Sequence, residues 1–422
     1  MTVSERETDV LIVGGGPAGL AAGAELAAAG AGRVEILERE QEAGGIPRHC
    51  HHGGFGGRLD RSAYAWATAT GSAYAGGTTG PAYARHGVSA AVGAGASLRT
   101  GVTVTGWAGP RTVETTGPAG LERITARAVV LATGARERPR SARLIPGTRP
   151  AGVYTTGELQ RAVHLYGQRI GSRAVVVGGE PVRHAAVATL RAAGVHVVAV
   201  VTDRPPPPVR LRSRSVPLLT CATITGLTGR KRLSGVELRH DDGRTTTLPC
   251  DTVVLTGDFV PDHELARRGG LHLDPGTLGP AYDAAFRTSR PGVFAVGNLL
   301  HAVERAGFAA QEGRAAAVPV LHHLAGTGDP GGGGRRLVVD APLRWIAPNV
   351  TGPDGARPPG DRFVLRTARR LPRPLLVVSQ NGRELHRQRI LLPAVPGRPF
   401  ALAADWLDRV DAHGAPVRIS AS

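Results

Sequence analysis

The sequence predicts an α/β protein with two strand–glycine turn–helix–strand units and a small antiparallel β domain after them. Residues 9–38 and residues 173–201 both show the first pattern, in which an apolar strand leads through glycines into an alanine-rich helix and a second strand. Beyond residue 335 the pattern changes to short alternating runs that are typical of half-buried strands. A chain of 422 residues can bury two or three such cores.

The first unit has the spacing of a dinucleotide-binding turn. Three glycines stand in GxGxxG order after the strand. The first permits the tight turn, the second lets the backbone approach a pyrophosphate, and the third lets the helix pack closely on the sheet. The helix N-terminus stabilises phosphate charge, and the acid that ends the second strand is placed to bind ribose hydroxyls. The candidate binding residues of this unit are Gly14, Gly16, Pro17, Ala18, Gly19, Glu38 and Arg39.

The second unit has an altered turn. Gly178 stands at the first glycine position, but Glu180 replaces the second glycine and Arg183 replaces the third. A side chain at the second position blocks the backbone approach, and its carboxylate repels a pyrophosphate, although Arg183 offsets part of this charge. We therefore expect NAD(P) to bind here weakly or not at all, and the unit to serve packing and subunit contacts.

Two further segments indicate which dinucleotide the first unit binds. They are VVLATGARERP (129–139) and TSRPGVFAVGNLLHAVERAGFAAQEGRAAA (288–317). With the first unit, they resemble the signatures of the two-dinucleotide-binding-domain flavoproteins, the pyridine nucleotide-disulfide oxidoreductase superfamily, over roughly residues 8–325. The resemblance implies that FAD is the cofactor and that it also contacts Gly45, Ala132, Thr133, Gly134, Gly297 and Asn298. Most of the family has aspartate in place of Asn298, whose amide can still donate and accept hydrogen bonds.

A narrower resemblance concerns the loop Gly44–Gly57 and the change to Glu180 in the second turn. In these features the chain is similar to the FAD subunits of amino-acid, opine and sarcosine-type dehydrogenases, and to flavoproteins related to anaerobic glycerol-3-phosphate dehydrogenase. It lacks the redox cysteine pair that the disulfide reductases of the superfamily carry after the ribose-binding acid.

The resemblance implies an FAD-binding Rossmann-type domain with an inserted second Rossmann-like domain. Residues 250–270 read as a strand and glycine turn that return the chain to the first domain. Asn381-Gly382, between two alternating runs, marks a two-residue hairpin in the last domain. The expected boundaries are 1–155 and 250–326 for the FAD-binding domain, 156–249 for the degenerate NAD(P)-binding-like domain, 327–336 for a Gly-rich linker, and 337–422 for the small β-rich domain.

The loop Gly44–Gly57 contains four consecutive residues of kinds that bind metals, move protons or react with electrophiles: His49, Cys50, His51 and His52. In extended chain only alternate residues converge, whereas a zinc site needs three or four ligands. The missing ligands would have to come from His164, His184, His301, His322 or His323, which show no recognisable spacing. We therefore expect no metal, and we expect no dithiol chemistry because Cys50 has no cysteine nearby.

The interpretation that we favour places this loop, without any helix, at the floor of the flavin pocket. Its glycines let the chain pass close to a ring, and Arg48 can offer a cation to a substrate carboxylate. A histidine can accept the proton that leaves when an amine or alcohol gives hydride to flavin. The sequence does not choose among His49, His51 and His52, and Cys50 could form an adduct or tune the flavin.

The composition bounds the partners and the compartment. The formal charge of +17 comes almost entirely from arginine spread along the chain, with Lys231 as the single lysine, and aromatic residues make up only 4%. We therefore expect no nucleic-acid binding. Three cysteines without a paired spacing, a polar N-terminus and no apolar run of about 18–20 residues indicate a cytoplasmic protein without a membrane span.

These observations favour an FAD-dependent dehydrogenase or oxidase that moves a hydride from a small amine, amino acid or hydroxy acid to flavin. The alternatives are an NAD(P)H-dependent flavin reductase and a non-catalytic FAD-binding subunit of a heteromeric dehydrogenase. The expected partners are a small-molecule substrate and, as candidates, a second dehydrogenase subunit, an electron acceptor or further copies of this chain.

Overall fold

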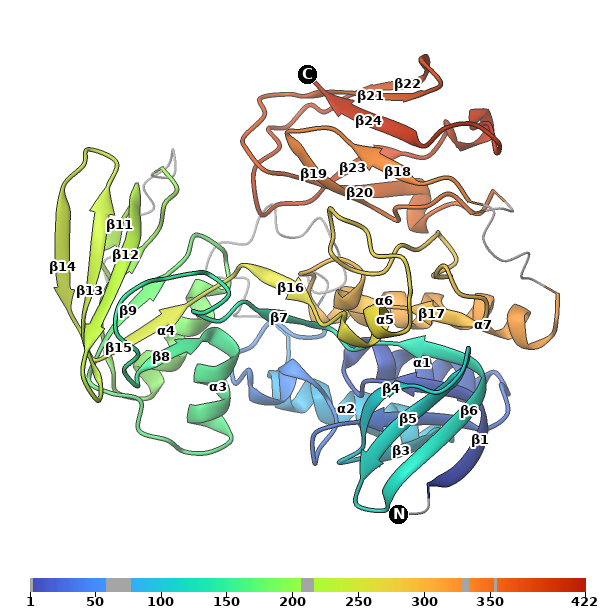
Figure 1. The fold of residues 1–422 in the computed structure, drawn as a ribbon, viewed down its shortest axis with the longest axis horizontal. Helices are drawn as coiled ribbons and strands as arrows, with labels where there is room; N and C mark the ends of the chain where they lie inside the picture. Colours follow the sequence, from blue (N-terminus) through green and yellow to red (C-terminus); the bar gives the residue numbers. More distant parts are fainter. Residues whose placement is uncertain (1–2, 58–76, 206–215, 328–333, 353–354) are drawn as a thin grey trace.

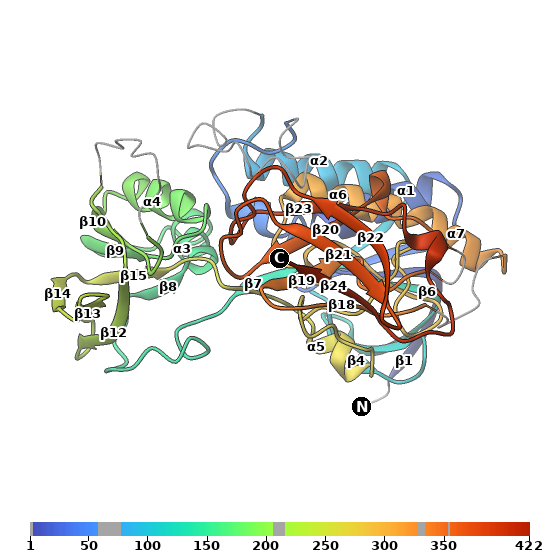
Figure 2. The same ribbon diagram turned by 90° about the horizontal axis from the view of Figure 1, so that it is seen from above.

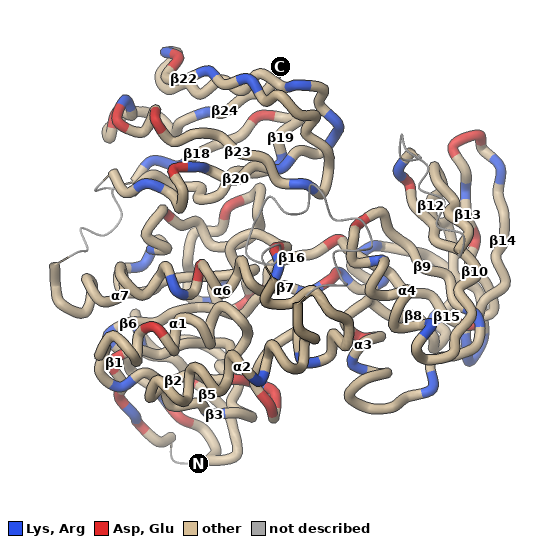
Figure 3. The backbone as a smooth tube through the Cα atoms, turned by 180° about the vertical axis from the view of Figure 1, so that it is seen from behind, with Lys and Arg blue, Asp and Glu red and all other residues tan. Residues whose placement is uncertain are grey.

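The computed structural model describes residues 3–57, 77–205, 216–327, 334–352 and 355–422, which form three parts (Figure 1). The two larger parts, which we call the first unit and the second unit after the glycine turn that each contains, lie side by side. The C-terminal β domain covers the first unit, as the view from above also shows (Figure 2). Most of the expected linker 327–336 lies outside the described residues. Lys and Arg positions occur along all three parts (Figure 3).

The first unit is built on a seven-stranded sheet. Its strands, in spatial order, are β3 (Ser97–Thr100), β2 (Val34–Glu38), β1 (Ser4–Val13), β6 (Gly120–Leu131), β5 (Thr112–Gly117) and β4 (Thr103–Trp107), and β17 (Val293–Ala295) also pairs with β6. The end of β1 is buried on both faces, as its unbroken apolar run predicts. The helices of this unit are α1 (Pro17–Ala28), α2 (Gly80–Gly93), α5 (Glu264–Arg268), α6 (Ala306–Ala315) and α7 (Ala317–Leu324).

Four parallel strands of this sheet end at one edge. Val13 of β1 pairs with Leu37 of β2 and with Leu131 of β6, and Ala295 of β17 also pairs with Leu131. The chain therefore does return to the first sheet after the second unit. The residues that follow these four strands are the ones in which the sequence places the cofactor, and parallel α/β sheets bind ligands at this edge.

The second unit contains a five-stranded parallel sheet and an antiparallel ribbon. The parallel strands, in spatial order, are β11 (Leu218–Leu219), β10 (His196–Val201), β9 (Arg173–Val177), β15 (Thr252–Leu255) and β8 (Val153–Thr155), and the helices are α3 (Thr156–His164) and α4 (Arg183–Ala192). The antiparallel strands are β12 (Ala222–Gly229), β13 (Leu233–His240) and β14 (Thr245–Pro249). The two crossings between the units pair with each other as β7 (Ala135–Glu137) and β16 (Phe259–Pro261).

The strand pairing moves the unit boundaries from those expected. β8 and β15 fall within the ranges 1–155 and 250–326, which the sequence assigned to the FAD-binding domain, yet both hydrogen-bond within the second sheet. Their apolar runs look alike in either sheet, so only the pairing partner decides the assignment. We propose that the units divide at the crossing strands β7 and β16.

The C-terminal domain packs two small sheets face to face. One contains β18 (Leu337–Val339), β24 (Val417–Ala421), β21 (Leu375–Gln380) and β22 (Arg383–Arg389), and the other contains β19 (Leu343–Ala347), β20 (Arg362–Thr367) and β23 (Phe400–Ala403). The predicted hairpin is confirmed: Asn381 and Gly382, with φ of 52° and 78°, connect β21 to β22. One pair departs from the antiparallel prediction, because β18 runs parallel to β24.

Within the described ranges, no helix combines the length and the apolar character that a membrane crossing requires.

Candidate active site

The first glycine turn packs tightly on the end of β6. Gly14 has φ of 112°, and a Cβ there would collide with the carbonyl oxygen of Ala132; a Cβ on Gly19 would collide with the carbonyl oxygen of Gly14. Gly16 differs, because the nearest atom to its missing Cβ is the Cα of Gly45, 4.0 Å away. The outer two glycines are thus needed for the turn, and the middle one leaves room for a ligand.

Glu38 lies buried beside this turn. Its Oε2 accepts a hydrogen bond from the Gly15 N–H at 2.9 Å, and its Oε1 accepts one from the Glu40 N–H at 2.9 Å. No side chain among the described residues caps α1, and no acidic residue stands in its first turn. The first turn of α1 therefore offers free N–H groups and a positive end to an anion, with a fixed carboxylate next to it.

The other predicted cofactor residues meet this turn from two sides. The Thr133 hydroxyl donates to the Asp262 carbonyl oxygen at 2.7 Å, the Asp262 N–H donates to the Gly134 carbonyl oxygen at 2.8 Å, and Arg39 forms an ion pair with the Asp262 carboxylate at 3.4 Å. These residues thus meet on Asp262, which the sequence analysis did not identify.

Gly297 reaches the turn from the late segment. Its φ is 72°, and a Cβ on it would lie 2.7 Å from the Ala18 Cβ, so the backbone passes directly over the first turn of α1. The Asn298 side chain is occupied within the protein: its Oδ1 accepts from the Glu304 N–H at 2.7 Å, and its Nδ2 donates to the Glu304 carbonyl oxygen at 3.1 Å. Both polar atoms of the Asn298 amide are thus used within the protein, and only their remaining hydrogen-bonding capacity is left for the predicted contact with the cofactor.

The donors and the space at this edge fit the ADP half of FAD. An uncapped helix N-terminus suits a pyrophosphate, the buried Glu38 carboxylate suits ribose hydroxyls, and the gap above Gly16 admits a backbone-to-phosphate contact. The described residues of the edge therefore meet the requirements of the cofactor that the sequence implies.

The loop Gly44–Gly57 folds over the same turn. The Gly44 N–H donates to the Gly15 carbonyl oxygen at 2.7 Å, and a Cβ on Gly45 would lie 2.9 Å from the Gly16 Cα. Contrary to the expectation of a loop without helix, Ile46–His49 forms one 3₁₀ turn, which the positive φ of Gly45 and the following proline start. Arg48 pairs with Glu42 at 3.1 Å.

Cys50 is a buried thiol and not an exposed nucleophile. Its Sγ donates to the carbonyl oxygen of Ile46 and to Oε1 of Gln160, both at 3.4 Å. Burial raises the pKa of Cys50 to about 12, so the thiol stays protonated at working pH.

His51 and His52 are also held by neighbours. The exposed His51 ring stacks on His164, with ring centroids 4.1 Å apart. His52 has Nδ1 at 2.8 Å from the Gly53 carbonyl oxygen and stacks on Phe55 at 5.3 Å. In the described part of the chain, no three His, Cys, Asp or Glu side chains gather in an arrangement that could hold a metal ion.

His49 has a different environment from these three residues. It is 4% exposed, and its Nε2 has no hydrogen-bond partner among the described residues. Burial, followed by the charges of Arg161 and Arg48, lowers the pKa of His49 to about 4. His49 is therefore neutral at working pH, and the same burial and charges oppose its protonation.

The second unit supports this loop through one face of α3. Gln160 contacts Cys50, His164 stacks on His51, and both terminal nitrogens of Arg161 bond the two carboxylate oxygens of Glu40 at 3.1 and 3.2 Å. No spacing in the sequence shows these contacts, since 110 residues separate Cys50 from Gln160.

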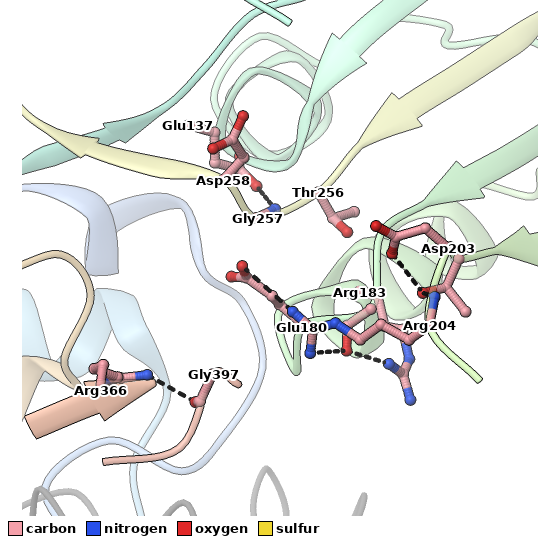
Figure 4. Close-up of polar contacts among 12 residues, drawn as sticks. Glu137, Glu180, Arg183, Asp203, Arg204, Thr256, Gly257, Asp258, Arg366 and Gly397 are labelled. Atoms are coloured by element: carbon pink, nitrogen blue, oxygen red, sulfur yellow. Dashed lines mark hydrogen bonds and ion pairs between the residues drawn. The ribbon is translucent and has the colours of Figure 1, made fainter. Parts of the chain in front are cut away.

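The second glycine turn repeats the backbone of the first but is filled by side chains (Figure 4). The Gly178 N–H bonds the Val201 carbonyl oxygen at 2.9 Å, as the Gly14 N–H bonds that of Leu37 at 2.8 Å. By this correspondence, Thr202 stands where the first unit has Glu38. The second unit therefore lacks the ribose-binding acid, a difference that the sequence analysis missed.

Three charged side chains occupy the second cleft (Figure 4). A Cβ on Gly257 would lie 2.6 Å from Glu180 Cδ, so the Glu180 side chain crosses from the turn to the end of β15. The Gly179 carbonyl oxygen accepts hydrogen bonds from Arg183 at 2.7 Å and from Arg204 at 3.4 Å, and Arg204 also pairs with Glu180 at 4.0 Å. Glu180 thus stands where the first turn has the open position of Gly16.

Comparison with known proteins supports the same cofactor and fold. The family model described as pyridine nucleotide-disulphide oxidoreductase matches residues 8–313. The sarcosine oxidase α subunit of Corynebacterium sp. (strain P-1) is 31% identical over 66% of this chain, and an opine oxidase subunit of Agrobacterium tumefaciens (strain Ach5) is 28% identical over 75% of it. This chain spans 29% of the former relative's length and 66% of the latter's.

A solved structure shares the fold. Thioredoxin reductase of T. acidophilum superimposes with a TM-score of 0.59 at 21% identity, covering 75% of this chain and 98% of that one. Because the family model covers well over half of the residues, the chain belongs to the pyridine nucleotide-disulphide oxidoreductase family and is an FAD-dependent oxidoreductase.

Proposed function

We propose that the chain oxidises a small N-alkylated amino acid at FAD and does not use NAD(P)H as its reductant. The observation that carries the proposal is the filled second cleft. Glu180 lies against Gly257, and Arg183 bonds the carbonyl oxygen of Gly179. A dinucleotide would have to displace these side chains and would then meet a carboxylate with its own phosphates. Electrons must then reach the flavin from another donor.

The substrate class follows from the named relatives. Sarcosine is N-methylglycine and opines are N-substituted amino acids, so both sets of substrates are secondary amines with a carboxylate. Since this chain spans only part of both relatives, the transfer of their substrate class belongs to the proposal. The partner also belongs to the proposal: a second subunit or a separate electron acceptor reoxidises the cofactor.

The residues of the loop supply the acid–base chemistry. FAD, when bound, supplies the acceptor of the hydride. Oxidation of an amine to an imine also releases a proton, and the unpartnered Nε2 of His49 accepts it, at an energetic cost that its low pKa reflects. Arg48 offers its positive charge to the substrate carboxylate, in competition with its largely exposed partner Glu42.

The test is to reduce the bound flavin under anaerobic conditions and to measure the reduction as the loss of the flavin's visible absorbance. The donors are N-methylglycine, an N-carboxyalkyl amino acid, glycine, lactate, NADH and NADPH. We expect bleaching by the first two donors only. Rapid bleaching by NADH or NADPH would contradict the proposal and favour a flavin reductase. Bleaching by lactate alone would show that the substrate is a hydroxy acid and not an amine.

A second candidate function remains distinguishable in the same experiment. Both relatives are subunits of larger enzymes, which favours a non-catalytic FAD-binding subunit if FAD is bound and no donor bleaches it. The His49→Gln variant serves as the control for chemistry in this chain. A donor that bleaches wild type and His49→Gln at equal rates does not use this loop.

A further inference from the structure

The C-terminal β domain reaches into the cofactor edge through a buried ion pair. Arg366, on β20, places Nη2 at 2.7 Å from Oε1 of Glu304, and the two side chains are 10% and 1% exposed. The other end of the guanidinium, Nη1, donates to the carbonyl oxygen of Gly397 at 2.7 Å. Glu304 lies in the late segment, between β17 and α6. The pair therefore links two parts of the chain that are far apart in sequence.

Glu304 in turn fixes the turn that passes over α1. Its N–H and its carbonyl oxygen bond Oδ1 and Nδ2 of Asn298 at 2.7 and 3.1 Å. An asparagine makes both bonds because its amide donates as well as accepts, whereas an aspartate could only accept. The departure from the family's usual aspartate at this position thus has a local cause: the side chain joins two stretches of backbone.

A second buried carboxylate supports the same turn. Glu312, on α6, accepts from the Gly297 N–H at 3.1 Å with one oxygen and lies 3.0 Å from Nε2 of His301 with the other. Trp345, on β19 of the C-terminal domain, packs against this arrangement: its ring lies 5.4 Å from that of His301 and 5.6 Å from the Arg366 guanidinium. Arg366 and Trp345 of the C-terminal domain thus pack against the residues that hold the Gly297–Asn298 turn in place.

We propose that the C-terminal β domain is a working part of the FAD site, in which Arg366 positions the Gly297–Asn298 turn through Glu304. Arg366 is a positioning residue, since it acts on the cofactor edge only through other groups. The inference rests on the FAD site described above, but it does not depend on the substrate.

The physical reason is the charge of Glu304. Within the described residues, the second carboxylate oxygen of Glu304 has no hydrogen-bond partner, and burial raises the pKa of this group, while Arg366 opposes that rise. Without Arg366 the carboxylate would be buried and unpaired, a state that proteins relieve by protonation or by moving the group to water. Movement of Glu304 would carry Asn298 with it, because the backbone of Glu304 makes both bonds to that side chain.

The experiment compares FAD affinity in five proteins: wild type and four variants. Arg366→Gln removes the charge from the pair, and Arg366→Gln/Glu304→Gln removes both charges. The matched control is Arg418→Gln, which breaks the exposed pair of Arg418 with Asp340 in the same domain. Apoprotein of each is titrated with FAD by flavin fluorescence, and the melting temperature of the apoprotein and the visible circular dichroism of the bound flavin are recorded.

We expect Arg366→Gln to weaken FAD binding by about tenfold to a hundredfold and to change the flavin dichroism, whereas Arg418→Gln matches wild type. The double variant should regain part of the affinity because no unpaired charge stays buried. Asn298→Asp, which loses the donated bond, should also weaken FAD binding although it restores the family's usual residue.

Three outcomes separate the possibilities. If wild-type protein binds no FAD, the cofactor site itself is wrong. If wild type binds FAD and Arg366→Gln binds it equally well with unchanged dichroism, the positioning role of Arg366 is rejected. If Arg366→Gln does not fold, the double variant takes its place, and wild-type affinity and dichroism in that variant, together with wild-type affinity in Asn298→Asp, reject the proposal.

Discussion

The two glycine turns of this protein have the same backbone but different contents. In both, the first glycine N–H bonds a carbonyl oxygen near the end of the second strand, and a Cβ on that glycine would collide with the residue that follows a third strand. In the first turn, the middle position is Gly16, and the cleft stays open beside the buried Glu38. In the second, the middle position is Glu180, and Arg183 and Arg204 lie on the turn.

If the second turn binds no dinucleotide, as we propose, this fold is kept for other contacts. The second unit contacts the first through α3, where Gln160 bonds Cys50 of the loop and Arg161 pairs with Glu40, just before the loop. These contacts come from α3, which carries none of the charged side chains that lie in the second glycine turn. We therefore propose that the first unit binds the cofactor and that the second unit helps to hold the loop beside it.

The largest effect should come from making the first turn resemble the second. Gly16→Glu places a carboxylate at the N-terminus of α1, where it bonds the free N–H groups and repels the pyrophosphate. We expect the purified variant to contain no flavin, as measured by its absorbance per chain. Gly93→Glu, which adds the same charge at an exposed position of α2 with open space around it, should keep its FAD.

The next effect concerns the proton acceptor in the loop. His49→Gln keeps the size of the side chain but cannot take up a proton, so flavin reduction by the amine donor should slow by about a hundredfold to ten-thousandfold. FAD content should not change. Equal rates in the variant and wild type at pH 7 would remove His49 from the mechanism.

The pH dependence of stability gives an independent check on His49. Its folded pKa of about 4 lies below the usual value of 6.5, so between these values the unfolded chain holds more protons than the folded one. The free energy of unfolding should therefore fall as the pH is lowered from 6.5 to 4, and less so in His49→Gln. Denaturant unfolding at pH 7 and pH 5 measures this difference. Parallel losses in both proteins would contradict the buried neutral state.

A smaller effect should follow from loosening the support of the loop. Arg161→Ala removes the paired contact with Glu40, which is part-exposed, so its loss costs about 0.2–1 kcal/mol. We expect kcat/KM for the amine donor to fall by about two- to fivefold, with unchanged FAD content. Arg173→Ala, at the exposed start of β9 in the same unit, should leave the kinetics unchanged.

The smallest effect should come from Cys50. Cys50→Ala removes a protonated thiol and two weak hydrogen bonds, so activity should stay within about twofold of wild type. Iodoacetamide at pH 8 should not label Cys50 in the folded protein. Complete loss of flavin reduction in Cys50→Ala would show thiol chemistry that the buried environment does not predict.

The sequence predicts those parts of the fold that depend on local pattern. The GxGxxG spacing gives the first turn and its acid, and Asn381-Gly382 gives its hairpin, because glycine positions report directly on backbone conformation. The assignment of β8 and β15 could not be predicted, because a short apolar strand fits either parallel sheet equally well.

The site was predictable only where it follows strand ends. The sequence could not show which residue of the run His49–His52 is the candidate base, because that choice depends on which side chain α2 and α3 bury. Asp262 and Arg366 were missed because their partners lie 223 and 62 residues away, and only the folded chain brings them together. Glu304 was missed although Asn298 lies only 6 residues away, because no motif marks the bonds between them.

On this account the first glycine turn binds a dinucleotide and the second does not. The most direct measurement is the number of dinucleotides per chain, by native mass spectrometry of FAD-loaded protein titrated with NADH and NADPH under anaerobic conditions. We predict one FAD per chain and no bound NADH or NADPH up to about 1 mM, which corresponds to an affinity weaker than about 4 kcal/mol. A second dinucleotide bound at micromolar concentration would contradict the claim.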